Sequence, residues 1–457
     1  MPLVTAFYLA IALVVMLLLT DRARLHPFVA VIVVTAAFGF AVHMSLSQIG
    51  NLFGVGFTVT LQALGLVIVA ASLMSVLAEQ SGGADRLAAA APRRPLLARI
   101  VTVIGTFAGL ASTPGAAVAV LTPLMRSLGR NRADGGNRLT IFLSLAISAG
   151  HGLLLPAPVL VAGMAILGAK AQPIVLIGWP LAVVIAIIGA ISASLVLGRL
   201  SPASLIPGSL TPGSLAAGHS WQATAPVPSG PTAGRVAIAL VIASLVLVVL
   251  LAIQSLADIP SEPLGGGPAR EMLLGLGRPF LLIIVGPGLL LLALNRWSRD
   301  IISAEGWLGR GLIQAAPTLL LIGAAGGFQR VLQETGMAEL LGEKLLTWHL
   351  GLLLPFGVAA VIKTLQGSSL VAAITAAGMI QPLLVGLGLD DDTGRALAVL
   401  AIGIGSMTVS HINDALFWLI GENARLRPGQ TLVIVTFSML VQAVVAMLLL
   451  QIIAIVI

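Results

Sequence analysis

Residues 100–125 read IVTVIGTFAGLASTPGAAVAVLTPLM, and this apolar stretch decides how the rest of the chain is threaded. It is long enough to cross a hydrocarbon core of about 30 Å, but basic loops flank it on both sides. Those loops carry Arg86, Arg93, Arg94, Arg99, Arg126, Arg130, Arg132 and Arg138. Because basic loops stay on the cytoplasmic side of a membrane, a crossing would put one group on the wrong side. With a turn at Pro114-Gly115, the stretch is predicted to be a re-entrant helical hairpin.

The composition indicates that most of the chain lies in a membrane. Of 457 residues, 58% are hydrophobic and 9% are charged, and the mean hydropathy is +1.08. A soluble domain has about 25% charged residues, so this chain cannot cover a water-facing surface. Residues 1–20 lack a basic start and a small-residue cleavage site, which predicts a first span and not a signal peptide.

The residue types in the chain argue against several kinds of functional site. The chain has no Cys, which excludes disulfides, a thiolate nucleophile and a Cys-ligated metal site. The net charge is +7, and the basic residues lie in short loops between apolar spans. This pattern sets the orientation of the chain in the membrane and does not predict nucleic-acid binding. No nucleotide-binding loop occurs, which argues against an ATP-driven pump. We expect no cofactor and no metal.

About ten transmembrane helices are expected from apolar length, together with two hairpins. The spans are residues 2–20, 27–43, 54–79, 139–169, 174–198, 236–257, 279–295, 311–334, 395–420 and 431–457. The hairpins are 100–125, which starts inside, and 348–388, which starts outside and has its tip at residues 366–369. This arrangement keeps most basic residues in the cytoplasm and both termini outside.

The chain divides into two halves that match at an offset of roughly 250 to 260 residues. Residues 1–199 form the first repeat and 235–457 the second, while 200–234 have the composition of a linker and are expected in the cytoplasm. His26-Pro27-Phe28, for example, matches Arg278-Pro279-Phe280. Each half holds five spans and one hairpin, and because five is odd, the second half is predicted to be inverted. The predicted fold is therefore an all-α polytopic membrane protein with two inverted repeats.

Two spans are predicted to be broken near the middle of the membrane. Residues 139–169 would be about 46 Å long as one helix, more than the core needs, and they contain Gly150-His151-Gly152. Residues 395–420 contain Ser410, His411, Asn413 and Asp414. Backbone groups freed at a break must line a cavity or be capped by polar side chains. His151 and Asn413 are therefore candidates for substrate binding, although a lone His can equally satisfy a freed carbonyl.

Asp414 and His411 are the candidates for proton coupling. An ionisable residue inside a span is costly and is a functional candidate by default. The two residues are three positions apart, so they would share a helix face if the segment is wound there, and could bind a proton together. The alternative is a structural hydrogen bond that braces the break. Glu79 and Glu334 end their spans, which favours a packing role.

The hairpin tips supply further candidates for substrate binding. These are Thr113 and Gly115 in the first hairpin, and Gly367, Ser368 and Ser369 in the second. Small residues would let the tips approach a substrate, and hydroxyls would bind it; the alternative is close helix packing. Lys363 lies in the second hairpin, where it either attracts an anion or extends to the outer surface, and the sequence does not separate these.

At these residues the chain resembles the gluconate permease family of the ion transporter superfamily. The motifs that carry the likeness are RLHPF (24–28), LAEQSGGA (77–84), SAGHGL (148–153), QGSS (366–369), TAAG (375–378) and SHINDALFW (410–418). The resemblance implies proton-coupled uptake of gluconate-like sugar acids, or of D-serine in some members. It also suggests a homodimer, which no residue pattern here requires. Family members typically have an acidic first hairpin tip, whereas residues 111–115 here contain no acid.

The predicted function is secondary active transport of a small organic anion across the inner membrane, coupled to protons by alternating access. A sodium-coupled carrier, or an exchanger of another carboxylate or a D-amino acid, is the alternative. A channel is disfavoured because no repeated selectivity-filter sequence occurs. A hydrolase using Ser410 and His411 is disfavoured because adjacent helical residues point about 100° apart. The chain is therefore not expected to be an enzyme.

Overall fold

The computed structural model describes residues 2–91, 94–111, 113–131, 136–199, 231–257, 267–295, 298–336 and 350–456. Every regular element in these ranges is helical. Most of the predicted linker at 200–234 and of the loop at 335–347 lies outside the described residues.

The helices of the first half end with α9, and those of the second begin with α11. In chain order the first are α1 (Pro2–Leu17), η1 (Leu18–Arg22), α2 (Pro27–Ala41), α3 (Leu46–Gln80), α4 (Gly83–Ala90), α5 (Arg94–Ala108), α6 (Pro114–Gly129), α7 (Asn137–Leu153), α8 (Pro158–Leu167) and α9 (Ala171–Arg199). The second are α11 (Pro231–Ala257), α12 (Gly267–Leu276), α13 (Pro279–Leu294), α14 (Arg299–Ile302), α15 (Trp307–Gln333), α17 (Leu353–Gln366), α18 (Ser369–Ile380), η3 (Gln381–Leu383), α19 (Asp392–Gly405), α20 (Ala415–Asn423), α21 (Pro428–Thr431), η4 (Leu432–Thr436) and α22 (Phe437–Val456).

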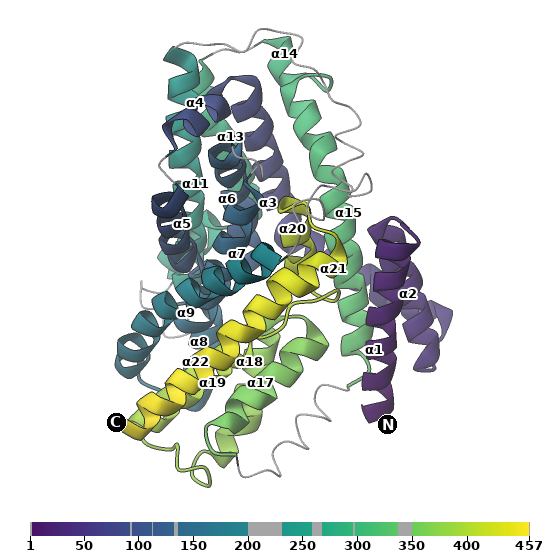
Figure 1. The fold of residues 1–457 in the computed structure, drawn as a ribbon, viewed down its shortest axis with the longest axis vertical. Coiled ribbons are helices and arrows are strands. Elements are labelled where there is room, and N and C mark those ends of the chain that lie inside the picture. Colours follow the sequence, from purple (N-terminus) through teal and green to yellow (C-terminus); the bar gives the residue numbers. More distant parts are fainter. Residues whose placement is uncertain are drawn as a thin grey trace.

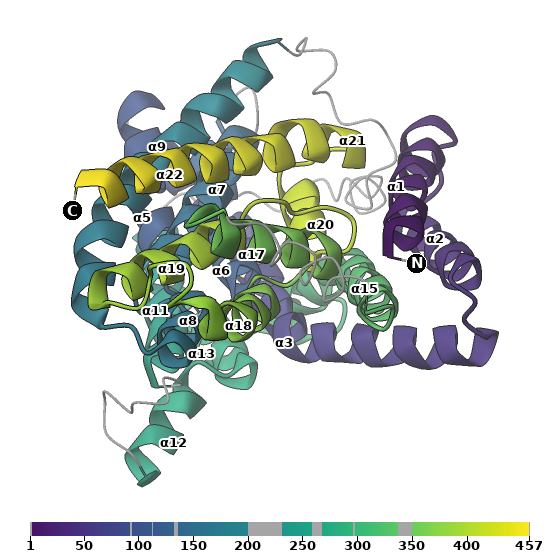
Figure 2. The ribbon, with the colours of Figure 1, turned by 90° about the horizontal axis from the view of Figure 1, so that it is seen from below.

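Long apolar helices confirm the polytopic membrane class. Within the described ranges, six helical segments are long and apolar enough to cross a membrane, or seven if the bent pair α12 and α13 forms one span. Figure 1 shows α1 and α2 at one side of the molecule, and Figure 2 shows α3 running from them into the main helix bundle. The expected count of ten spans and the inverted repeat stay predictions.

The two predicted hairpin segments each form a pair of short helices. The first pair is α5 and α6, and the second is α17 and α18. The longest of the four, α6, has 16 residues and spans about 24 Å, less than a hydrocarbon core of about 30 Å. Each second limb starts with a hydroxyl cap: Thr113 Oγ1 accepts from Ala116 N–H at 3.1 Å, and Ser368 Oγ accepts from Val371 N–H at 3.3 Å.

Two ion pairs connect loops that lie next to the hairpins. Arg130, after the first hairpin, pairs with Asp85, before it, at 2.8 Å. Asp392, after the second hairpin, pairs with Lys170 at 2.5 Å. The pairs therefore join loops that the charge pattern assigns to the same side of the membrane, the first inside and the second outside.

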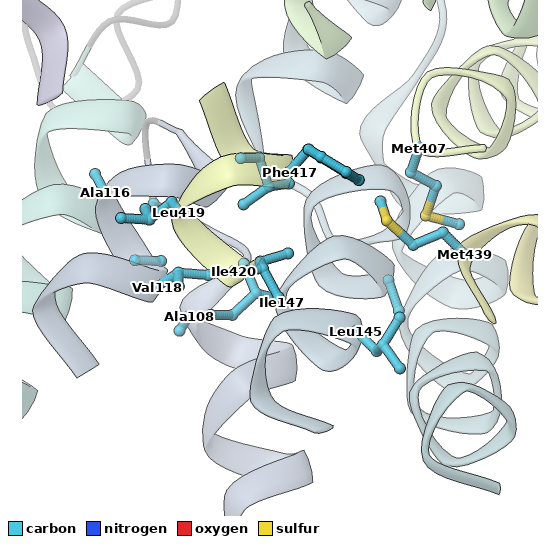
Figure 3. Packing of buried hydrophobic residues seen from close by; sticks show 14 of the residues in the cluster. Ala108, Ala116, Val118, Leu145, Ile147, Met407, Phe417, Leu419, Ile420 and Met439 are labelled. Atoms are coloured by element: carbon cyan, nitrogen blue, oxygen red, sulfur yellow. The ribbon is translucent and has the colours of Figure 1, made fainter. Parts of the chain in front are cut away.

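The core places α20 of the second half among helices of the first. In Figure 3, Leu419 and Ile420 lie among Ala116 and Val118 of α6, Ala108 at the end of α5 and Ile147 of α7. All of these side chains are buried, as is Phe417. The contacts fix the direction of α20 and hence the position of its first residues.

Candidate functional site

The tip of the second hairpin meets the break between α19 and α20. Gly367 ends α17 with a φ of 73°, a left-handed conformation that favours glycine. A β-carbon here would collide with the backbone carbonyl oxygen of Asn413. The tip and the unwound segment 406–414 therefore touch backbone to backbone, and only glycine fits between them.

A buried ion pair crosses this junction. Lys363 of α17 donates to Asp414 Oδ2 at 2.6 Å and to the carbonyl oxygen of Gly367 at 2.8 Å. The Lys363 side chain is 2% exposed, which rules out the predicted alternative in which it extends to the outer surface. Ser410 Oγ donates to the same carboxylate oxygen at 2.7 Å. Lysine and carboxylate thus neutralise each other in a region where an unpaired charge would be costly.

Asp414 also starts α20. Its second oxygen, Oδ1, accepts from Leu416 N–H at 2.9 Å, the N-cap interaction that satisfies a free donor at a helix start. The residue has extended backbone angles and lies just before the helix. Any movement of this carboxylate is therefore coupled to the first turn of α20.

His411 does not pair with Asp414, which corrects the expectation of a shared helix face. The chain is unwound between Gly405 and Ala415, so the three-residue spacing does not bring the two side chains together. Instead His411 Nε2 donates to the carbonyl oxygen of Thr364 at 2.6 Å. The other ring nitrogen, Nδ1, is buried and has no hydrogen-bond partner.

Asn413 clamps the end of α17. Its amide nitrogen donates to the carbonyl oxygens of Thr364 and Leu365, each at 3.1 Å. Because both amide hydrogens point to carbonyls, the assignment of the amide oxygen is fixed. That oxygen, Oδ1, is buried and has no hydrogen-bond partner. The junction thus holds two unsatisfied acceptors, one from Asn413 and one from His411.

His151 lies in the last turn of α7, which stays helical to Leu153, just before the other break at residues 154–157. Its Nδ1 bonds to the carbonyl oxygen of Gly109, beyond the end of α5, at 3.1 Å. This contact matches the alternative in which the side chain satisfies a freed carbonyl. Indole groups do the same at both breaks: Trp179 donates to Leu155 O at 3.2 Å, and Trp418 donates to Ile412 O at 2.9 Å.

The remaining tip residues have contacts typical of packing and capping. The Thr113 and Ser368 hydroxyls serve as helix caps, and Ser369 is the half-buried first residue of α18. A β-carbon on Gly115 would contact Leu64 of α3 at 3.3 Å and Leu419 of α20 at 3.8 Å. The structure therefore joins Gly367, Asn413, His411 and Asp414 in one cluster, while the first hairpin tip has apolar neighbours.

Lys363 is the member of the cluster that the sequence did not assign. The sequence did contain a signal for this ion pair. It has a lysine and an aspartate in predicted membrane segments, and such residues of opposite charge usually pair. Among the described residues, no group of three His, Asp or Glu side chains is placed to hold a metal ion.

Comparison with known proteins gives the family. The model of the GntP family permeases matches residues 1–456. The high-affinity gluconate transporter of Escherichia coli K12 is 29% identical over 94% of this chain and 94% of its own length. The gluconate permease of Pseudomonas aeruginosa PAO1 is 27% identical over 92% and 91%. The Neisseria gonorrhoeae MtrF structure aligns over 88% and 83% at 18% identity, with a TM-score of only 0.35. The chain belongs to the GntP permease family and is a membrane transport protein, not an enzyme.

Proposed function

We propose that this permease takes up gluconate or a related sugar acid together with protons, by alternating access. The substrate class follows from the relatives, which are named gluconate permeases and transporters and match over 91% to 96% of their length. Coupling to protons is inferred from the chemistry of the site.

The observation that carries the proposal is the Lys363–Asp414 pair at the hairpin tip. A lysine can attract a carboxylate substrate, and an aspartate can take up and release a proton. Both are buried, and Asp414 lies in the unwound segment before α20, the arrangement in which carriers expose backbone groups to a substrate.

The arrangement of hairpins and breaks supports alternating access. Each hairpin precedes a helix that is broken, α7 with α8 and α19 with α20. The ion pairs Asp85–Arg130 and Lys170–Asp392 agree with hairpins that start from opposite sides. A site between two such elements can be covered from one side at a time.

A cavity beside α20 offers a route from the cytoplasm. It lies between residues 20–27 and residues 417–431, and its charged lining residues are Asp21, Arg24, Glu422 and Arg427. Trp418, which also lines it, donates to Ile412 in the break. The cavity thus leads to the first turn of α20, which follows the break.

Uptake into proteoliposomes tests the proposal. With an acidic outside, labelled gluconate should accumulate above its external concentration, saturate, and be displaced by unlabelled sugar acids. The panel includes other hydroxy acids and D-serine, and a sodium gradient without a pH gradient serves as the matched condition. Accumulation driven by a sodium gradient alone would show that sodium, and not the proton, is the coupling ion. No uptake of any acid on the panel would overturn the substrate class, and flux that never saturates would indicate a channel.

A further inference from the structure

We propose that the carboxylate of the substrate replaces Asp414 as the partner of Lys363, an exchange of partners that leaves Asp414 without its counter-ion. Asp414 is then protonated, so that one anion and one proton move together without net charge. The inference rests on the proposed function and deepens it. It assigns the anion and the proton to separate members of one ion pair.

The first step concerns the cation that meets the substrate. Lys363 is held by two acceptors, Gly367 O and Asp414 Oδ2, and an ammonium group has three donors. The other titratable groups that face the pair are His411 from the break and His151 from α7, and both bond backbone carbonyls. Lys363 therefore offers an anionic substrate that reaches the tip an ammonium group whose third donor is not used by these two acceptors.

The second step concerns Asp414. If the substrate carboxylate takes over the ammonium group, Asp414 Oδ2 keeps only the Ser410 hydroxyl, and Oδ1 keeps Leu416 N–H. A buried carboxylate without its counter-ion carries a large desolvation cost, which protonation removes. A proton from water on the side of uptake then binds Asp414. On release, the anion leaves Lys363, the proton leaves Asp414 to the other side, and the ion pair forms again.

The third step concerns recognition of hydroxyl groups. The unsatisfied acceptors Asn413 Oδ1 and His411 Nδ1 flank the tip that holds Lys363. A buried acceptor without a donor is costly, and a hydroxyl next to the substrate carboxylate would satisfy it. The site therefore fits an acid with a hydroxyl near its carboxylate, and it should discriminate against the corresponding deoxy acid.

The charge balance gives a test in the unmodified protein. In proteoliposomes clamped with potassium and valinomycin, gluconate uptake should be unchanged between zero and an inside-negative potential, and it should acidify the lumen by one proton per anion. Uptake that carries current, or that proceeds without lumenal acidification, would overturn the exchange of partners. Absence of uptake under any gradient would instead contradict the proposed function.

Variants assign the two roles. Asp414→Asn should still bind and exchange gluconate, because Lys363 remains, but should lose accumulation driven by a pH gradient. Lys363→Gln should lose binding and exchange by roughly 30-fold or more. Lys170→Gln removes an exposed lysine and is the matched control, with wild-type transport expected. Exchange at the wild-type rate in Lys363→Gln, or proton-driven accumulation in Asp414→Asn, would contradict the assignment.

A double variant guards against misfolding. Each single change leaves one buried charge without its partner, which can destabilise the fold. Lys363→Gln combined with Asp414→Asn removes both charges and should elute as folded protein. It should bind no gluconate in a tryptophan fluorescence titration, whereas binding with wild-type affinity would overturn the role of Lys363.

Discussion

Gly152 and Gly403 lie backbone to backbone where the two broken helices cross. A β-carbon on Gly403 would collide with the carbonyl oxygen of Gly152, and one on Gly152 would meet the Gly403 carbonyl oxygen at 2.8 Å. Gly152 is next to His151 at the end of α7, and Gly403 is in the last turn of α19. The two breaks are therefore neighbours, as a shared transport site requires.

Gly403→Ala should separate the broken helices and lower both stability and transport. An added methyl group in a fully packed backbone crossing typically costs about 1–3 kcal/mol. Thermal unfolding in detergent and gluconate uptake measure the two effects. Gly288→Ala is the control, because a β-carbon there has open space in α13. Equal behaviour of the two variants would contradict the close crossing.

Gly367→Ala should reduce transport more than it reduces stability. The left-handed backbone costs a residue with a side chain roughly 1–2 kcal/mol, and the new methyl group pushes the tip away from Asn413. Retraction of the tip moves Lys363 from Asp414, so the maximal uptake rate should fall. Gly357→Ala in α17 has free space and should transport normally. Full activity of Gly367→Ala would show that the tip contact has no role.

Trp418→Phe should destabilise the break before α20. The indole donates to the carbonyl oxygen of Ile412, and a buried acceptor left unpaired costs about 1–3 kcal/mol. Trp179→Phe removes the corresponding bond at the other break, but that bond is longer, 3.2 Å against 2.9 Å, and Trp179 is 38% exposed whereas Trp418 is 3% exposed, so less packing is lost. Thermal unfolding should therefore show the larger loss for Trp418→Phe, and the reverse order would argue against a capped break.

Arg126→Gln should lower stability where Arg130→Gln has little effect. Arg126 lies in the last turn of α6 and donates to Asn423 of α20 at 3.2 Å, a bond between the two halves. Loss of a partly buried, charge-assisted hydrogen bond lowers the free energy of unfolding by about 1.5–3 kcal/mol. The pair between Arg130 and Asp85 is about 40% exposed on both sides, and exposed pairs contribute about 0–1 kcal/mol. The difference is measured as the shift in unfolding temperature of each variant.

The sequence predicted the elements of the site better than their contacts. The first break followed from the length of residues 139–169, the second from the glycine and polar residues within 395–420, and a hairpin at 100–125 from the arginines around it. In the structure the second break lies at 406–414, whereas α7 stays helical through Gly150-His151-Gly152 and the first break lies at 154–157. Local composition is enough for such predictions because each depends on one segment and on the solvent around it.

The contacts depend on how distant segments are placed. Lys363 and Asp414 are 51 positions apart, and nothing local to either residue specifies the partner. His411 and Asp414 do not share a helix face because the chain is unwound there and Asp414 caps the next helix, and their role in coupling stays a prediction. Hydroxyls at the tips satisfied helix starts, a local use that competes with substrate binding.

The proposed transport site requires two hairpins that start from opposite sides of the membrane and lead to one buried junction. Because the chain has no Cys, a membrane-impermeant maleimide can test single substitutions in an otherwise unchanged protein. Asn131→Cys and Val385→Cys are at exposed positions beyond the first and second hairpin helices. We predict that Asn131→Cys is labelled only from the cytoplasmic side and Val385→Cys only from outside. Labelling of Asn131→Cys from outside would mean that residues 100–125 cross the membrane, and it would contradict the account.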